Sequence, residues 1–118
     1  MHVENIRTYC LDKPAVSESF PFNEHTLVFK VAGKIFALFS LEKQPLQINL
    51  KCEPEKAIDL RERFHSVITG YHMNKQHWNT LIIDGELPKK FIEYLIDHSY
   101  DLVVSKLTKK VKSEFLLE

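Results

Sequence analysis

The sequence is poor in the residues that mark linkers and disulfide frameworks. Of its 118 residues, three are glycine, five are proline and two are cysteine. Because glycine and proline are scarce, no long flexible linker is indicated, and we expect one domain over residues 1–118. Cys10 and Cys52 lie far apart and outside any Cys/His cluster, so neither a zinc site nor a disulfide scaffold is indicated. Both are expected to be small buried apolar side chains.

The sequence also lacks an excess of charge of either sign. Its 16 basic and 16 acidic side chains give a formal net charge of +0, whereas proteins built mainly to neutralise phosphates are basic. Strong general affinity for DNA is therefore excluded, and only a local basic patch stays open. No apolar run approaches the roughly 18 residues of a membrane span, and the first residues lack a signal-peptide pattern. We expect a soluble, cytoplasmic protein with no membrane partner.

Familiar active-site motifs are absent as well. The sequence contains no GxGxxG or Walker loop, no GxSxG elbow and no HExxH helix. Of six histidines only His72 and His77 are close in sequence, and their spacing suits neither one helix face nor one strand face. His98, Ser99 and Asp101 are too close together to converge as a hydrolytic triad. We therefore expect a non-enzymatic protein with no metal and no cofactor.

What is present in the first half predicts a helix followed by strands. Apolar spacing predicts an amphipathic helix over about residues 2–11. Residues 19–23, with a proline between two phenylalanines, predict an ordered loop held by its rings. Gly33 supplies the positive φ of a tight hairpin turn. Alternating apolar and polar residues predict three strands, over residues 26–31, 34–40 and 46–51.

The second half predicts three helices and one strand. Pro54 and Pro88 each open a helix, and residues 78–83 form a strand between them. Ser99 is expected to cap a last helix, and residues 111–118 to form a frayed tail. The order predicts the α+β class, with an antiparallel β-sheet and helices packed on one face.

The densest run of polar and aromatic side chains covers residues 70–79. As a recognition segment, Lys75 would bind a phosphate or carboxylate while Tyr71 and Trp78 would stack on bases. As part of the fold, Trp78 would instead anchor the core. The residues alone leave both interpretations open. The side chains that could donate hydrogen bonds to a base or ligand are His72, Asn74, Gln76 and Asn79.

A second basic feature lies near the end of the sequence. Four lysines, Lys106, Lys109, Lys110 and Lys112, are close together there. They could contact a polyanion, or they could be the solvated end of a helix whose dipole they complement.

Several blocks of the sequence occur in a characteristic order. They are SFPF at 19–22, TLVFKV at 26–31, KIFAL at 34–38, NLKC at 49–52, LRER at 60–63, GYHMNK at 70–75, HWNT at 77–80 and HSYDLV at 98–103. Over about residues 13–110 the sequence thereby resembles the MmcQ/YjbR family of small bacterial proteins. The resemblance implies a frataxin-like α+β fold, also described as a double-wing DNA-binding motif. Iron binding is not expected, since the first helix region offers only Glu4 and Asp12 as acids.

The resemblance also singles out candidate DNA-binding residues. They are the polar and aromatic positions of the matching blocks, together with one residue of the basic cluster: Lys51, Tyr71, His72, Asn74, Lys75, His77, Trp78 and Lys106. Three positions depart from the family's pattern and affect loop rigidity. Ala15 and Asn23 stand where glycine is usual, and Thr69 where proline is usual.

The expected function is weak, salt-sensitive and sequence-tolerant DNA binding by a monomer, through a β-hairpin wing and residues 71–79. The alternative is a protein-interaction or small-ligand adaptor, in which residues 71–79 line a pocket and Lys75 and His72 capture a carboxylate or phosphate. A continuous positive stripe joining Lys51, Lys75 and Lys106 would favour nucleic acid. A concave pocket with isolated charges would favour the adaptor.

Overall fold

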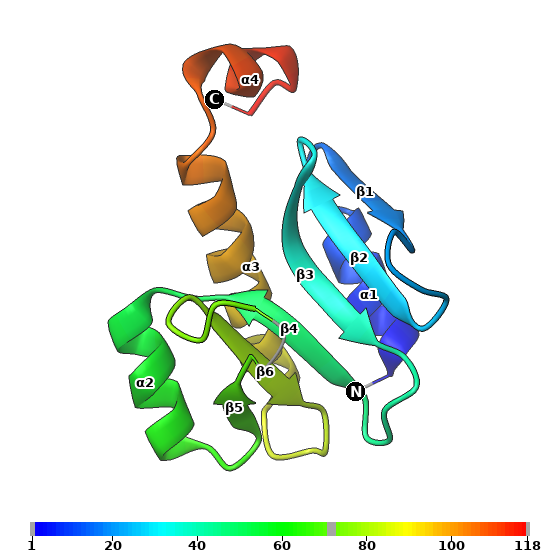
Figure 1. Ribbon diagram of the computed structural model, residues 1–118, viewed down its shortest axis with the longest axis vertical. Coiled ribbons are helices and arrows are strands. Elements are labelled where there is room, and N and C mark those ends of the chain that lie inside the picture. Colours follow the sequence, from blue (N-terminus) through cyan, green and yellow to red (C-terminus); the bar gives the residue numbers. More distant parts are fainter. Residues whose placement is uncertain (1, 71–72, 118) are drawn as a thin grey trace.

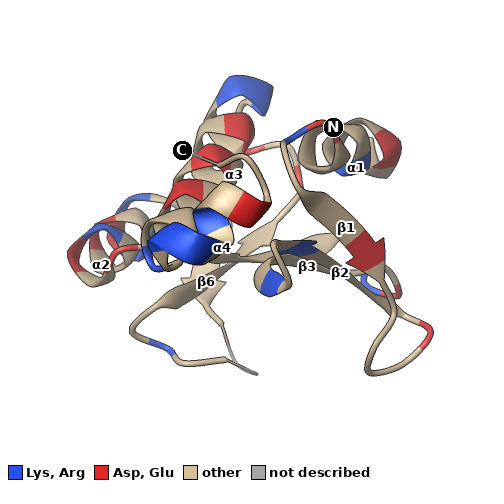
Figure 2. Cartoon of the chain, turned by 90° about the horizontal axis from the view of Figure 1, so that it is seen from above, with Lys and Arg blue, Asp and Glu red and all other residues tan. Residues whose placement is uncertain are grey.

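The computed structural model describes residues 2–70 and 73–117, and within them the chain forms one antiparallel sheet with helices packed on one face (Figures 1 and 2). The strands lie side by side in the order β1-β2-β3-β4-β6-β5. This arrangement confirms the expected α+β class. The elements are α1 (Val3–Leu11), β1 (Val16–Ser19), β2 (Thr26–Val31), β3 (Lys34–Ser40), β4 (Gln47–Lys51), α2 (Pro54–Arg63), β5 (Val67–Thr69), β6 (Trp78–Ile82), α3 (Lys89–Ser105) and α4 (Lys109–Glu114).

Local sequence signals account for most of these elements. In β4, Ile48 and Leu50 are buried while Gln47, Asn49 and Lys51 are half-buried, which confirms the predicted alternation. Gly33 turns the β2–β3 hairpin with a φ of 82°. Both cysteines are buried and free, as expected, with Cys10 on the buried face of α1 and Cys52 directly after β4.

The core lies mainly between the sheet and its helices. Phe29, Phe36 and Phe39 are fully buried there, and α3 covers them with residues such as Ile92 and Ile96. A smaller apolar cluster occupies the opposite face of the sheet, on which none of the described helices packs (Figure 2). Its buried members are Val28, Leu38 and Trp78.

The two helices expected after Pro88 are one continuous helix, α3, so the prediction that Ser99 caps a separate helix is wrong. Ser99 lies fully buried in the middle of α3. Its hydroxyl donates to the carbonyl of Phe36 at 2.6 Å and accepts from the backbone N–H of Lys51 at 2.9 Å. A serine is tolerated inside the helix because its hydroxyl joins α3 to both β3 and β4.

Two short edge strands, β1 and β5, are not predicted by the sequence analysis. The loop over residues 19–23 is present, but Phe20 and Phe22 are 49% and 64% exposed, so their rings do not hold it. The carboxamide of Asn23 does so instead, because its oxygen accepts the backbone N–H groups of His25 and Thr26, each at 2.8 Å.

A short helix, α4, follows α3 and includes residues 111–114 of the segment 111–118 that the sequence predicts as a frayed tail. The hydroxyl of Thr108, which caps α4, accepts the N–H of Val111 at 3.2 Å. None of the helices in the described part of the chain is long and apolar enough to cross a membrane.

Candidate functional site

The sheet divides into two arms at one end. The ladder between β3 and β4 stops at the pair Ala37–Leu50. The earlier residues of β3, which begin at Lys34, pair with β2 alone. Lys51, at the end of β4, pairs with β6 alone. The β2–β3 hairpin and the β4–β6 pair therefore diverge, and the last turns of α3 stand between the two in the view of Figure 1.

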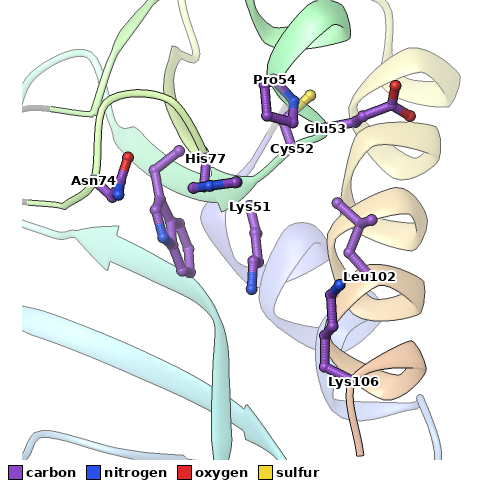
Figure 3. Close-up of a pocket in the computed structure, with 9 residues that line it drawn as sticks. Lys51, Cys52, Glu53, Pro54, Asn74, His77, Leu102 and Lys106 are labelled. Carbon is purple, nitrogen blue, oxygen red and sulfur yellow. The ribbon is translucent and has the colours of Figure 1, made fainter.

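A pocket of about 480 Å³ lies at the end of β4, beyond the point where the β3–β4 ladder stops. The end of β4, the start of α2, the loop before β6 and the C-terminal half of α3 all contribute to it (Figure 3). Its walls include the apolar side chains of Pro54 and Leu102. Its polar side chains are Lys51, Glu53, Asn74, His77 and Lys106.

A second pocket of about 220 Å³ shares Lys51 and Lys106 with the first. Lys34, from the tip of the β2–β3 hairpin, also lines it, and its apolar floor includes Ile35 and Val103. The two pockets therefore adjoin, and we refer to them together as the lysine groove.

The lysines of this groove are not neutralised by acids. Among the described residues, no ion pair involves Lys34, Lys51 or Lys106. Glu53 is the one acidic residue that the described part of the chain contributes to the lining of the two pockets. The groove therefore presents an excess of positive charge, although the whole chain is neutral.

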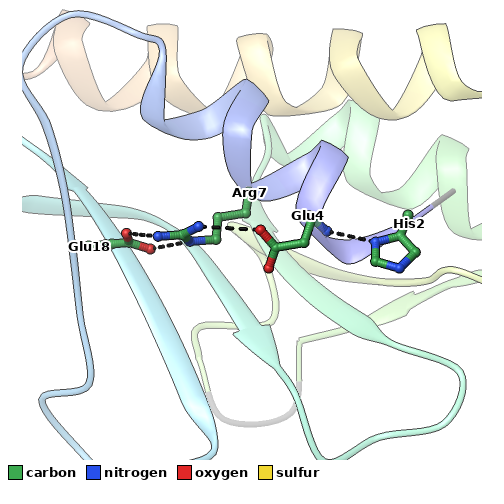
Figure 4. Close-up of polar contacts among 4 residues, drawn as sticks. All are labelled: His2, Glu4, Arg7 and Glu18. Atoms are coloured by element: carbon green, nitrogen blue, oxygen red, sulfur yellow. Dashed lines mark hydrogen bonds and ion pairs between the residues drawn. The ribbon is translucent and has the colours of Figure 1, made fainter.

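Arg7 shows the contrasting arrangement, in which a cation is fully paired within the fold. Its guanidinium donates two hydrogen bonds to Glu18, at 2.6 and 2.8 Å, and one to Glu4 at 3.3 Å (Figure 4). The hydrogen bonds and charge of Glu18 raise the pKa of Arg7. This cation joins α1 to β1 and is not available to a ligand in the way that the groove lysines are.

Most of the described candidate residues come together in the first pocket. Lys51, Asn74, His77, Trp78 and Lys106 all line it. Tyr71 and His72 lie outside the described residues. Lys75 is exposed on the same loop but does not line either pocket of the groove, and its carbonyl accepts a hydrogen bond from Arg61 at 3.4 Å.

Trp78 and Asn79 are part of the architecture. Trp78 is 8% exposed and packs with Val28 and Leu38, so the interpretation as a core anchor is confirmed and the ring is no open stacking platform. Asn79 is buried beneath α2. Its amide donates to the carbonyl of Ala57 at 3.3 Å, and its oxygen accepts from Arg61 at 2.6 Å. The suggestion that Asn79 donates to a base is therefore wrong.

Backbone hydrogen bonds fix the loop that carries Asn74 and His77. The N–H of His77 donates to the carbonyl of Asn74 at 3.1 Å, and the N–H of Cys52 donates to the carbonyl of His77 at 2.8 Å. Gly70 allows this close packing, because a Cβ there would lie 3.0 Å from the Cβ of Trp78. The loop therefore holds His77 directly beside the end of β4.

His98 and Ser99, two of the three residues with the side chains of a hydrolytic triad, bond to different parts of the fold. His98 accepts the backbone N–H of Glu53 at 3.2 Å, and Ser99 is committed to β3 and β4. Burial and the nearby charge of Lys56 lower the pKa of His98. Burial raises the pKa of Cys52 to about 11, so its thiol stays protonated at neutral pH and is a poor nucleophile.

Sequence reasoning missed Lys34 and Leu102 as groove residues. Lys34 begins β3 directly after the glycine turn, a position that a hairpin pattern alone could have placed at the tip of a wing. Leu102 lies on the α3 face that borders the first pocket, which only the packing of α3 on the sheet reveals.

Comparisons with known proteins agree with this fold. The YjbR family model matches residues 11–102. Uncharacterized protein YbdF of Escherichia coli O157:H7 is 36% identical over 107 residues, which cover 91% of this chain and 88% of the relative. Uncharacterized protein YjbR of Escherichia coli K12 is 34% identical over 107 residues, covering 91% of each chain.

Solved structures extend the similarity to three dimensions. The crystal structure of Deinococcus radiodurans protein DR2400 matches with a TM-score of 0.93 at 38% identity, covering 98% of this chain and 88% of that one. A crystal structure of a Pseudomonas syringae protein matches with a TM-score of 0.75 at 28% identity, covering 86% and 98%. On the family match and these relatives, the chain belongs to the YjbR family.

Proposed function

We propose that this protein is a non-enzymatic nucleic-acid-binding protein that contacts the phosphate backbone through the lysine groove. The observation that supports the proposal is the grouping of Lys34, Lys51 and Lys106 around two adjoining pockets, with no ion pair to any of them among the described residues. Such a row of lysines suits a ligand with several negative charges in succession, which a nucleic-acid backbone provides.

This grouping differs at one position from the positive stripe of Lys51, Lys75 and Lys106 considered in the sequence analysis. Lys51 and Lys106 share both pockets, but the third lysine of the groove is Lys34 in place of Lys75. Lys75 lies on the loop that borders the first pocket, where its backbone is bonded to Arg61. The three groove lysines come from the hairpin tip, β4 and the end of α3.

Further lysines lie at the same end of the molecule. Helix α4 begins shortly after Lys106 and brings three more basic side chains beyond the end of α3 (Figures 1 and 2). Since Lys106 lines the groove, a nucleic acid bound there would pass close to the start of α4. These side chains, which extend the proposed contact, are Lys109, Lys110 and Lys112.

Contacts of this kind predict a particular binding behaviour. Lysines that meet phosphates hold the backbone without reading base edges, so binding is sequence-tolerant. Because the chain has no net charge, attraction is limited to the groove and falls steeply as salt rises. Affinity in the weak, non-specific range of about 10⁻⁴–10⁻⁶ M is expected.

The test is a fluorescence-anisotropy titration of labelled DNA at low salt. The combined variant Lys34→Gln, Lys51→Gln, Lys106→Gln should lose most of the binding, because three phosphate contacts are removed together. A matched control removes the same charge elsewhere, through Lys43→Gln, Lys89→Gln and Lys90→Gln. These lysines are exposed and line neither pocket of the groove.

Two results would overturn the proposal. One is no binding by the wild-type protein at about 100 µM, the weak end of the non-specific range. The other is an equal loss in the groove variant and the control variant, which would attribute the attraction to total charge.

The adaptor stays the second candidate because the first pocket is concave. Its volume of about 480 Å³ falls within the range of about 300–1,000 Å³ that small-ligand sites occupy. In that case Lys51 and Lys106, which line the pocket, would hold a carboxylate or phosphate in place of Lys75. Saturable binding of inorganic phosphate by a protein that fails to bind DNA would favour this function.

A further inference from the structure

The first pocket of the lysine groove is shaped for more than a phosphate backbone. It combines two lysines with apolar walls and an imidazole within one concavity. We infer that it receives one unstacked nucleotide of a single strand, with the phosphate held by Lys51 and Lys106 and the base inside the pocket. This inference rests on the proposed function and makes it specific for single-stranded nucleic acid.

The charges define the phosphate end of the pocket. The side chains of Lys51 and Lys106 extend from β4 and α3 into the same part of it (Figure 3). The carboxylate of Glu53 lies at the other end, where α2 begins. Glu53 would repel a phosphate there, so the pocket orients a nucleotide with its phosphate toward the lysines.

The remaining walls suit a base. His77, from the loop before β6, and Leu102, from α3, lie on opposite sides of the pocket (Figure 3). Pro54 closes the end away from the lysines. Bases stack on imidazole rings and pack on apolar side chains whatever their sequence, while Asn74 at the rim offers a carboxamide for hydrogen bonding.

A duplex cannot use these walls. Its bases are paired and stacked inside the helix, so it offers the groove phosphates alone. A single strand can turn one base outward into the pocket and keep the same phosphates on the lysines. The pocket therefore predicts a preference for single strands, although a duplex carries more charge per unit length.

The experiment compares three labelled ligands by anisotropy at low salt: a short single strand, the same strand in a duplex, and an abasic strand with the same number of phosphates. The single strand should bind at least about fivefold more tightly than the abasic strand, the factor that one stacked base contributes. It should also bind more tightly than the duplex. His77→Ala should weaken single-strand binding by a similar factor and leave the other two ligands unchanged.

His25→Ala is the matched control, because His25 is an exposed histidine that does not line the groove. Thermal unfolding of both variants verifies that each one is folded. Equal affinity for the single strand, the duplex and the abasic strand would overturn the inference and leave the proposed function standing. Failure of all three ligands to bind would overturn the proposed function itself.

A nucleotide in this pocket could belong to a single strand or be a free nucleotide, and competition by a nucleoside monophosphate distinguishes the two. If the site serves a strand, the monophosphate should compete far more weakly than the single strand, since it lacks the neighbouring phosphates that meet Lys34. Competition by the monophosphate at the strand's own concentration would show a free-nucleotide site and overturn the assignment to single strands.

Discussion

Ala15 adopts a φ of 61°, in the left-handed region that alanine enters at a cost of roughly 1–2 kcal/mol. Glycine enters it freely but loses about 0.4–1 kcal/mol more chain entropy on folding. We therefore expect Ala15→Gly to raise the free energy of unfolding by about 0.5–1 kcal/mol, measured by urea denaturation.

Ala37→Gly is the opposing control. Ala37 is buried within β3 and its φ is not positive. Glycine at this position therefore relieves no backbone strain and removes a buried methyl group. This variant should be destabilised. A fall in stability for Ala15→Gly as well would contradict the account of strain at that turn.

Single residues mark where sequence reasoning succeeds and where it fails. The burial of Trp78 was one of two interpretations, and a tryptophan beginning a strand favours it. The role of Asn79 could not be predicted, because it depends on Ala57 and Arg61 of α2 packing over β6. The hairpin pattern could have placed Lys34 at the hairpin tip, but only the packed fold brings it beside Lys51.

At the scale of elements, α3 positions both sides of the groove. It carries Lys106 at its end, and it also holds β4, which carries Lys51. Ser99 accepts the backbone N–H of Lys51 and donates to the carbonyl of Phe36, so one buried hydroxyl fixes β3 and β4 against the helix at the point where they separate. The backbone of Lys51 is therefore anchored, while its ammonium group makes no ion pair within the described part of the chain.

Ser99→Ala should lower the free energy of unfolding by about 2 kcal/mol, because the N–H of Lys51 and the buried carbonyl of Phe36 would lose their partner. Ser105→Ala on the same helix is the control. Ser105 is exposed, and within the described part of the chain its hydroxyl bonds the carbonyl of Leu102 alone, so the loss of this hydroxyl should cost below about 0.5 kcal/mol. Urea denaturation measures both variants, and equal effects would contradict the structural role of Ser99.

The elements that the sequence analysis did not predict are too short to show the alternation of apolar and polar residues that marks a strand. β1 has four residues and β5 has three, so neither presents enough alternation to be separated from a loop. The longer β2, β3 and β4 were found because their patterns extend further. In α3 the misleading signal was Ser99, a typical capping residue whose actual role requires β3 and β4 as neighbours.

At the scale of the whole molecule, the sheet's two arms create the groove. The β2–β3 hairpin brings Lys34, the β4–β6 pair brings Lys51, and α3 brings Lys106 between them. The fold class followed from the order of elements along the chain. The groove did not, because it depends on where the β3–β4 ladder stops, and no sequence pattern specifies that point.

Neutral overall charge and a basic groove together make salt dependence the decisive property. The three groove lysines together should contribute about −2.7 to the slope of the logarithm of the binding constant against the logarithm of salt concentration for duplex DNA, and about −2.1 for a single strand. Phosphate contacts by Lys109, Lys110 and Lys112 would make both slopes steeper. A slope of this size distinguishes phosphate contact from binding of a neutral or singly charged ligand.

The measurement that tests this account most directly is the same salt titration on the wild-type protein and on the combined Lys34→Gln, Lys51→Gln, Lys106→Gln variant. The account predicts that the slope for duplex DNA becomes shallower by about 0.9 for each lysine removed, while the Lys43, Lys89 and Lys90 control keeps the wild-type slope. An unchanged slope in the groove variant would contradict the claim that the lysine groove meets the phosphates.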